Sequence, residues 1–200
     1  MPFFEIHSEG ESLLKDRGSK FYGFAFPVKN VEEVETHLAS LRKKFYDARH
    51  HCFAYRLGKN AEASVANDDG EPAHSAGTPI LNQLRSAALT NVLVVVIRYF
   101  GGTLLGVRGL IEAYAGAANL ALASLEKQEI IPTFSFEITF PYEKTSDVNR
   151  VLHRYQPKLV KADYTDICVQ QLQVHKNQEL NILKDLEAIL IQVKPLTEPE

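Results

Sequence analysis

Cysteine is scarce in this 200-residue chain, since only Cys52 and Cys168 occur and they lie far apart. Two such cysteines cannot build a disulfide framework, which favours a reducing compartment. Long hydrophobic runs are also missing, because the longest, residues 92–97, is too short to cross a bilayer. The N-terminus has neither the charged start nor the apolar stretch of a secretory signal peptide. We therefore expect a cytoplasmic protein without a membrane partner.

The chain also has no excess of basic over acidic residues. The net charge is −3, and both halves of the chain carry slightly more acidic than basic side chains. Tight binding of nucleic acid depends largely on neutralising phosphates, so this balance counts against a strongly basic binding module and leaves room for a local basic patch. Hydrophobic residues make up 45% of the chain and aromatic residues 10%, which is enough to build globular cores.

The first 130 residues alternate between predicted strands and helices. Asn30 is expected to cap a helix, because apolar residues follow it at three- and four-residue steps, with acidic residues early and basic residues late. Residues 92–100 form the strongest predicted strand, and their continuous apolar run indicates burial on both faces. Thr78 is expected to cap another helix with Pro79 at its first position. These two helices are predicted at 31–45 and 79–88 and a third at 107–125, and the other strands are predicted at 3–7, 20–28, 51–57 and 61–66.

A new pattern begins after Pro132. It predicts strands at 133–140, 159–165, 167–175 and 191–194 and helices at 147–155 and 180–190. The order βαββαβ is that of a ferredoxin-like domain. The sequence therefore predicts an α+β protein with two domains, residues 1–130 and residues 131–200.

The segment Arg98–Gly109 links the buried strand to a helix. Three of its glycines allow positive φ or a close approach of a ligand to the backbone: Gly101, Gly102 and Gly106. A helix N-terminus offers unpaired amides, and Arg98 and Arg108 flank the loop. Two interpretations stay open: the loop holds a phosphate or carboxylate, or the glycines only turn the chain. Neither the P-loop nor the dinucleotide-binding fingerprint is present.

The segment Asp68–Pro79 gathers acidic groups, a histidine, a hydroxyl and glycines within twelve residues. Its notable members are Asp68, Asp69, Gly70, Glu71, His74 and Ser75. They suit a metal or acid–base site, an exposed loop that recognises a protein or RNA partner, or a turn that caps the next helix. Spacing identifies no nucleophile–base pair, and Ser75 is outside any Gly-x-Ser-x-Gly elbow. No catalytic residue is assigned, and a non-enzymatic role is favoured.

Adjacent residues of a strand point to opposite faces, which bears on the neighbouring residues His50, His51 and Cys52 and on the pair Tyr99 and Phe100. His50, His51 and Cys52 do not have zinc-site spacing, and we predict neither a metal nor a cofactor. His51 is expected to face the core and His50 to face water. Tyr99 and Phe100 are candidates for stacking on bases, and one of them is expected to lie in the core.

The same residues carry a resemblance to the IMPACT/YigZ family. The matching positions are Asp69-Gly70-Glu71-Pro72, Ser75-x-Gly77-x-Pro79, Ile80-Leu81, Leu84, Leu89, Val95-Val96, Arg98-Tyr99-Phe100-Gly101-Gly102 and Leu105-Gly106. The resemblance covers about residues 15–125. Residues 131–200 resemble the additional C-terminal domain of the bacterial YigZ branch by position and pattern.

This resemblance implies both a fold and a function. The N-terminal domain should be an α/β sandwich like the second domain of a small-subunit ribosomal protein and domain four of elongation factor G, and the smaller C-terminal domain should be ferredoxin-like. Eukaryotic IMPACT proteins regulate translation initiation under amino-acid starvation through protein contacts. We therefore expect a translation-linked regulatory protein that binds RNA, the ribosome or a translation factor. The alternative is a small enzyme acting on a phosphorylated or carboxylated metabolite. The expected binding residues are Asp69, Gly70, Glu71, His74, Ser75, Arg98, Tyr99, Gly101, Gly102, Gly106 and Arg108.

Overall fold

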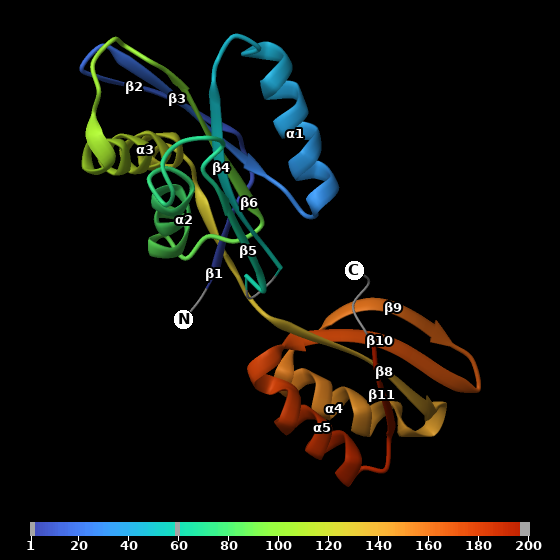
Figure 1. Cartoon of the computed structure of the whole chain (residues 1–200). Coiled ribbons are helices and arrows are strands. Elements are labelled where there is room, and N and C mark those ends of the chain that lie inside the picture. Colours follow the sequence, from blue (N-terminus) through green and yellow to red (C-terminus); the bar gives the residue numbers. More distant parts are fainter. Residues whose placement is uncertain (1–2, 59–60, 197–200) are drawn as a thin grey trace. The chain divides into compact units, whose positions relative to one another are not determined.

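The computed structural model describes residues 3–58 and 61–196. The chain divides into two compact units, residues 1–130 and 131–200 (Figure 1). Each unit has its own sheets and its own clusters of buried hydrophobic residues. Both units combine helices with antiparallel sheets, which confirms the predicted α+β class. Within the described ranges, no helix has the length and apolarity needed to cross a membrane.

A five-stranded antiparallel sheet forms the centre of the first unit, in the order β2-β3-β6-β4-β5. Its strands are β2 (Gly10–Asp16), β3 (Ser19–Pro27), β4 (His50–Leu57), β5 (Ala63–Asn67) and β6 (Val92–Tyr99). The central β6 is buried from Val92 to Arg98, so its predicted burial on both faces is confirmed. Its alternate residues enter two separate cores: Val92, Val94 and Val96 in one, Leu93, Val95 and Ile97 in the other.

Three helices cover the two faces of this sheet. α1 (Val31–Lys44) lies on one face, and α2 (Gly77–Ser86) and α3 (Gly106–Ala123) lie on the other (Figure 1). The predicted cap of α1 is confirmed, because the Asn30 side chain accepts a hydrogen bond from the backbone N–H of Glu33 at 2.9 Å.

Two strands lie where the sequence pattern predicts none. They are β2 and β7 (Lys127–Ile130), and β7 pairs with β1 (Phe3–Ile6) in a separate two-stranded sheet. β2 is an edge strand in which exposed and partly buried residues alternate, and β7 is largely exposed. Because neither strand is rich in buried apolar residues, the hydrophobic periodicity that identifies strands is weak in both.

The helix cap predicted at Thr78 is wrong. α2 begins at Gly77, and the backbone N–H groups of Ala76 and Gly77 donate to a carboxylate oxygen of Asp68 at 2.9 and 2.8 Å. Pro79 is therefore the third residue of the helix rather than the first. The capping side chain comes from the preceding turn and not from the residue next to the helix, where local capping patterns are sought.

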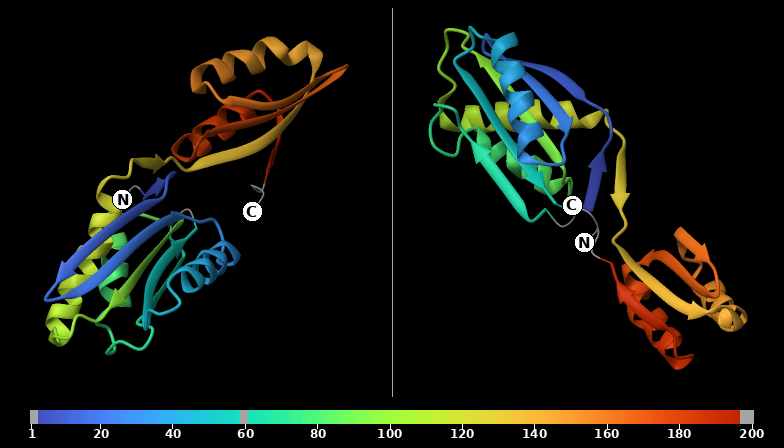
Figure 2. Two further views of the ribbon diagram at one scale, coloured as in Figure 1. Left: turned by 90° about the horizontal axis from the view of Figure 1, so that it is seen from above. Right: turned by 90° about the vertical axis from the view of Figure 1, so that its right-hand side faces the viewer.

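The second unit has the predicted ferredoxin-like arrangement βαββαβ, with the antiparallel strand order β11-β8-β10-β9. Its elements are β8 (Thr133–Pro141), α4 (Thr145–Tyr155), β9 (Lys158–Tyr164), β10 (Ile167–His175), α5 (Glu179–Ala188) and β11 (Gln192–Pro195), with single 3-10 turns at Tyr142–Lys144 and Lys176–Gln178. Alternate residues of β8 and β10, including Phe136 and Leu172, pack against Val148 of α4 and Ile182 of α5. Both helices cover the same face of this sheet (Figure 2).

Gly101 and Gly102 provide a matched pair for testing what the glycines do. A Cβ on Gly101 would lie 1.8 Å from the carbonyl carbon of Gly18, whereas a Cβ on Gly102 would meet nothing within 4 Å. Gly102 has φ +85°, which costs an L residue about 1–2 kcal/mol. We expect Gly101→Ala to lower the free energy of unfolding by more than Gly102→Ala does, because the clash at Gly101 involves backbone. Chemical denaturation of both variants measures this, and an equal or smaller effect at Gly101 would contradict the close approach.

Candidate binding site

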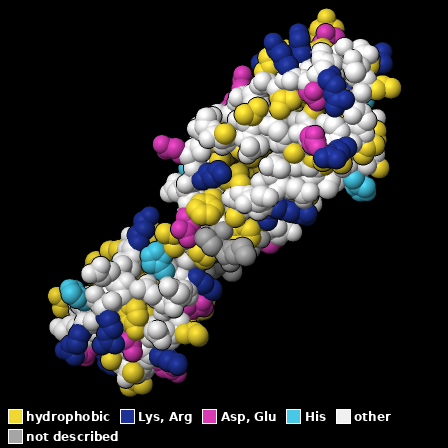
Figure 3. All heavy atoms as spheres, turned by 90° about the vertical axis from the view of Figure 1, so that its left-hand side faces the viewer, with side chains coloured by type: hydrophobic (Ala, Val, Ile, Leu, Met, Phe, Trp, Pro, Cys, Tyr) yellow, Lys and Arg dark blue, Asp and Glu magenta, His cyan; other side chains and the backbone are white. Residues whose placement is uncertain are grey.

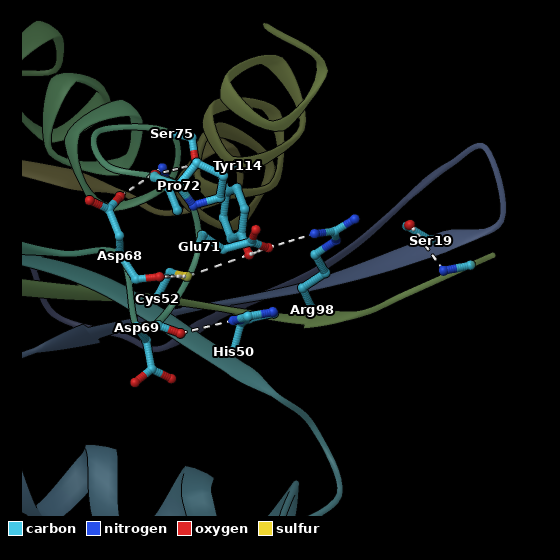
Figure 4. Close-up of polar contacts among 12 residues, drawn as sticks. Ser19, His50, Cys52, Asp68, Asp69, Glu71, Pro72, Ser75, Arg98 and Tyr114 are labelled. Atoms are coloured by element: carbon cyan, nitrogen blue, oxygen red, sulfur yellow. Dashed lines mark hydrogen bonds and ion pairs between the residues drawn. The ribbon is translucent and has the colours of Figure 1, made fainter. Parts of the chain in front are cut away.

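A buried ion pair joins the two segments that the sequence singles out. Nη1 of Arg98 lies 2.7 Å from Oε1 of Glu71, and the two side chains are 8% and 4% exposed. Glu71 belongs to the Asp68–Pro79 segment and Arg98 to the end of β6 (Figure 4). The two segments therefore meet in the fold, and their link is an internal contact between opposite charges.

The ion pair is part of a longer buried polar chain. The hydroxyl of Tyr114 on α3 donates to Oε1 of Glu71 at 2.8 Å, and Sγ of Cys52 on β4 lies 3.4 Å from that hydroxyl oxygen. Sγ of Cys52 also donates to the carbonyl oxygen of Asp68 at 3.0 Å. Burial raises the pKa of the Cys52 thiol to about 12 and also raises the pKa of Tyr114. Both groups therefore stay neutral near pH 7, and Cys52 is not a reactive thiolate.

The carboxylate of Asp68 organises the turn that precedes α2. Besides the two amides at the start of the helix, it accepts a hydrogen bond from the backbone N–H of His74 at 2.9 Å. Burial raises the pKa of Asp68, but these three hydrogen bonds outweigh it and hold the pKa below its ordinary value of 3.8. The capping role that the sequence left open for this segment is thus performed by Asp68.

The other predicted residues of the turn also bond within the protein. Asp69 accepts a hydrogen bond from the backbone N–H of His51 at 2.6 Å. Ser75 is fully buried and donates to the carbonyl of Pro72 at 2.7 Å. His74 is exposed, with Nδ1 3.3 Å from the hydroxyl of Thr78. Across the described part of the chain, no group of His, Cys, Asp and Glu side chains is arranged to hold a metal ion.

The predicted binding residues of the Arg98–Gly109 segment lie in different environments. Gly101 packs against the β2–β3 turn, whereas Gly102 and Gly106 have positive φ in open surroundings. The side chain of Arg108 is 94% exposed and lies 3.0 Å from Glu112 one helical turn later. Arg98 is buried against Glu71, whereas Arg108 is exposed, so the two arginines that flank the loop have different environments.

Two open pockets lie at the end of β6 and share an aromatic wall, formed by Tyr99 and Phe100. The first pocket, of about 470 Å³, is lined by Asp47, Arg49, His50, Arg98, Tyr99, Phe100 and Leu104. The second, of about 320 Å³, is lined by Gly18, Lys20, Tyr22, Phe45, Asp47, Tyr99 and Phe100. The hydroxyl of Tyr99 donates to Asp47 at 2.6 Å, and this bond raises the pKa of Tyr99 to about 12. Phe100 is 57% exposed.

His50 has a defined orientation beside the first pocket. Its Nδ1 lies 2.8 Å from the carbonyl oxygen of Asp69, and because a carbonyl only accepts, Nδ1 must carry the hydrogen (Figure 4). Nε2 is then the free nitrogen of the ring, and no hydrogen bond to it occurs among the described residues. His51 is only 6% exposed, which agrees with its predicted core position, while His50 is half-buried and not simply facing water.

Sequence reasoning missed four residues of the first pocket: Asp47, Arg49, His50 and Leu104. β4 and β6 are antiparallel, and His50 lies directly opposite Arg98 in their register. The start of β4 therefore meets the end of β6. Knowledge that β4 pairs with β6 would have identified His50 as a residue of the pocket. That pairing joins residues far apart in the chain.

The buried ion pair can be tested by removing one charge. We expect Glu71→Gln to lower the free energy of unfolding by about 3 kcal/mol, because it leaves the buried Arg98 charge without a counter-charge. The control is Glu112→Gln, which affects an exposed pair and should change the free energy of unfolding by less than about 1 kcal/mol. Urea unfolding measures both, and equally small effects would mean that the ion pair contributes no stability.

The cap at Asp68 should make stability depend on pH. Because its pKa is lower in the folded state, its contribution is complete above 3.8 and is lost as the pH falls through the folded-state pKa. We expect Asp68→Asn to lower the free energy of unfolding by about 1 kcal/mol at pH 7. The difference from the parent protein should shrink toward pH 3. Unfolding of both proteins across this range measures the difference, and a constant gap would contradict the role of the carboxylate.

Comparison with known proteins places the chain in a family. Residues 17–122 match the family model described as "Impact N-terminal domain". The chain is 34% identical to the IMPACT family member YigZ of Escherichia coli over 148 residues, which is 73% of this chain and 72% of that protein. It is 36% identical to YvyE of Bacillus subtilis over 120 residues, 60% of this chain and 55% of that protein.

A solved structure titled "Crystal structure of an hypothetical protein" superposes with a TM-score of 0.67 at 27% identity. The superposition covers 99% of this chain and 98% of the chain in that structure, so the similarity extends over both units. The match to the family model spans more than half of the sequence, including both segments that meet at the ion pair. The chain therefore belongs to the IMPACT/YigZ family.

Proposed function

We propose that this chain is a translation-linked regulatory protein and that it binds RNA, the ribosome or a translation factor through the aromatic wall and its two pockets. The observation that carries the proposal is the pair of open pockets on either side of Tyr99 and Phe100, with Arg49 in one and Lys20 in the other. Exposed aromatic rings next to cations are typical of surfaces that bind macromolecules. The link to translation follows from the role of the eukaryotic IMPACT proteins.

Two side chains of nucleophilic type, Cys52 and Ser75, are unavailable for catalysis, which favours a binding role. Cys52 is buried with a pKa of about 12, and the hydroxyl of Ser75 is committed to a backbone carbonyl. Neither can serve as an activated nucleophile. Nε2 of His50 is the one observation that favours the alternative, a small enzyme acting on a phosphorylated or carboxylated metabolite, because it could accept a proton.

The charge balance of the chain, with a net charge of −3, favours a local contact over a wide electrostatic one. On the face drawn in Figure 3, Lys and Arg side chains are interspersed with Asp and Glu side chains and do not form a continuous basic stripe. Proteins whose affinity for nucleic acid comes from neutralising many backbone phosphates need such a stripe. A partner of this chain is therefore expected to make a defined contact at the pockets.

Co-sedimentation with ribosomes at low and moderate salt tests the proposal. We expect the full chain to associate, and we expect Phe100→Ala to weaken association by about tenfold, because it removes the exposed ring. Arg49→Ala should act in the same direction.

The controls are Tyr142→Ala, which removes an exposed aromatic ring in the second unit, and Arg85→Ala, which removes an exposed arginine of α2. Both should bind like the parent protein. An absence of association at both salt concentrations would overturn the ribosome version of the proposal. Equal losses for controls and pocket variants would overturn the assignment of the site.

A further inference from the structure

We infer that the aromatic wall receives an unpaired nucleotide of single-stranded RNA, with its base against Phe100, a phosphate at Arg49 and His50, and the ribose 2′-hydroxyl at Asp47. This inference rests on the proposed function and names the ligand of the same site. A nucleotide has three chemically different parts, and the first pocket offers matching side chains for the base, the phosphate and the sugar.

Phe100 is suited to stack on a base. Its ring is largely exposed, and the guanidinium carbon of Arg98 lies 5.7 Å from the ring centroid. Arg98 is itself held by Glu71, so the ring rests on a fixed support. A ring positioned before binding loses little conformational entropy when a base stacks on it. Base–aromatic stacking is tolerant of sequence, because every base has a flat face.

Arg49 and His50 are suited to hold a phosphate. Arg49 is exposed and lines the first pocket, where its guanidinium can donate two parallel hydrogen bonds to phosphate oxygens. Nδ1 of His50 is fixed on the carbonyl of Asp69, which leaves Nε2 as the free nitrogen. When protonated, Nε2 donates to an anion. The pocket volume of about 470 Å³ is within the range of small-ligand sites.

Asp47 is suited to recognise the sugar. One of its carboxylate oxygens accepts the hydroxyl hydrogen of Tyr99 at 2.6 Å, which fixes the carboxylate in place. No hydrogen bond to the other oxygen occurs among the described residues, so it can accept from a ribose hydroxyl. A carboxylate repels phosphate, and its place in the pocket therefore favours the sugar over the phosphate as its contact. The 2′-hydroxyl is the group that distinguishes RNA from DNA.

The second pocket indicates a chain rather than a free nucleotide. It shares Asp47, Tyr99 and Phe100 with the first pocket and adds Lys20 on the other side of the wall. A strand that stacks one base on Phe100 carries phosphates on both sides of that nucleotide. Arg49 and Lys20 lie in different pockets, so each can contact one of these phosphates.

Titration of the full chain with three probes tests this inference: a fluorescent hexamer of uridylate, its deoxyuridylate counterpart, and uridine monophosphate. We expect the RNA hexamer to bind more tightly than the DNA hexamer and than the mononucleotide. Phe100→Ala should weaken RNA binding by about tenfold, as loss of one stacked base does, and Phe100→Tyr should restore it. Asp47→Ala should remove the preference for RNA over DNA. Tyr142→Ala is the control and should bind like the parent protein, and circular dichroism melts verify that each variant is folded.

Several outcomes would overturn the inference. One is binding of the RNA hexamer that Phe100→Ala leaves unchanged, and another is equal binding of hexamer and mononucleotide. If none of the probes binds while ribosome association persists and depends on Phe100, the wall receives a protein, so the inference fails and the proposed function stands. If the RNA hexamer binds as expected but ribosomes do not co-sediment, the inference stands and the ribosome version of the proposed function fails.

Discussion

The buried pair of Glu71 and Arg98 is the constraint on which the arrangement of the site depends. Two charges removed from water must be paired closely, and this pair is held by the 2.7 Å contact and by the hydroxyl of Tyr114, while Nε of Arg98 has no hydrogen-bond partner among the described residues. Glu71 comes from the turn before α2, Arg98 from β6 and Tyr114 from α3. The turn is therefore anchored to both the sheet and the helix. The same guanidinium lies beside the ring of Phe100, so the ion pair also supports the surface of the candidate site.

This constraint changes how the acidic segment is interpreted. A sequence with several carboxylates, a histidine and a serine close together resembles a reactive site, yet most of these groups bond to the protein itself. Asp68 caps a helix, Glu71 neutralises an arginine and Ser75 closes a turn. Such groups build the fold around the pockets, while the atoms free to contact a ligand belong to residues such as Arg49 and His50 at the pocket edge. The distinctive motif and the binding surface are thus neighbouring features with different roles.

The sequence predicted those parts of the fold that depend on local patterns. The helix after Asn30 and the alternating β10 show their period, and the doubly buried β6 its continuous apolar run, within one short stretch each. The missed features depend on residues far apart in the chain. The helix cap from Asp68 comes from outside the local window, and Gly101 is needed because it touches Gly18. His50 belongs to the pocket only because β4 pairs with β6, and no local pattern reports that pairing.

The acidic balance of the chain limits what kind of contact the site can make. Affinity for nucleic acid from counterion release grows with the number of phosphates neutralised, and the two pockets offer Arg49 and Lys20 for this purpose, with Arg98 already paired. A site with so few free cations must obtain its affinity from stacking and directed hydrogen bonds instead. Those interactions are short-ranged and need groups that are held in position, as Phe100 and Asp47 are. A nearly neutral protein can therefore recognise one exposed nucleotide while binding a continuous duplex backbone poorly.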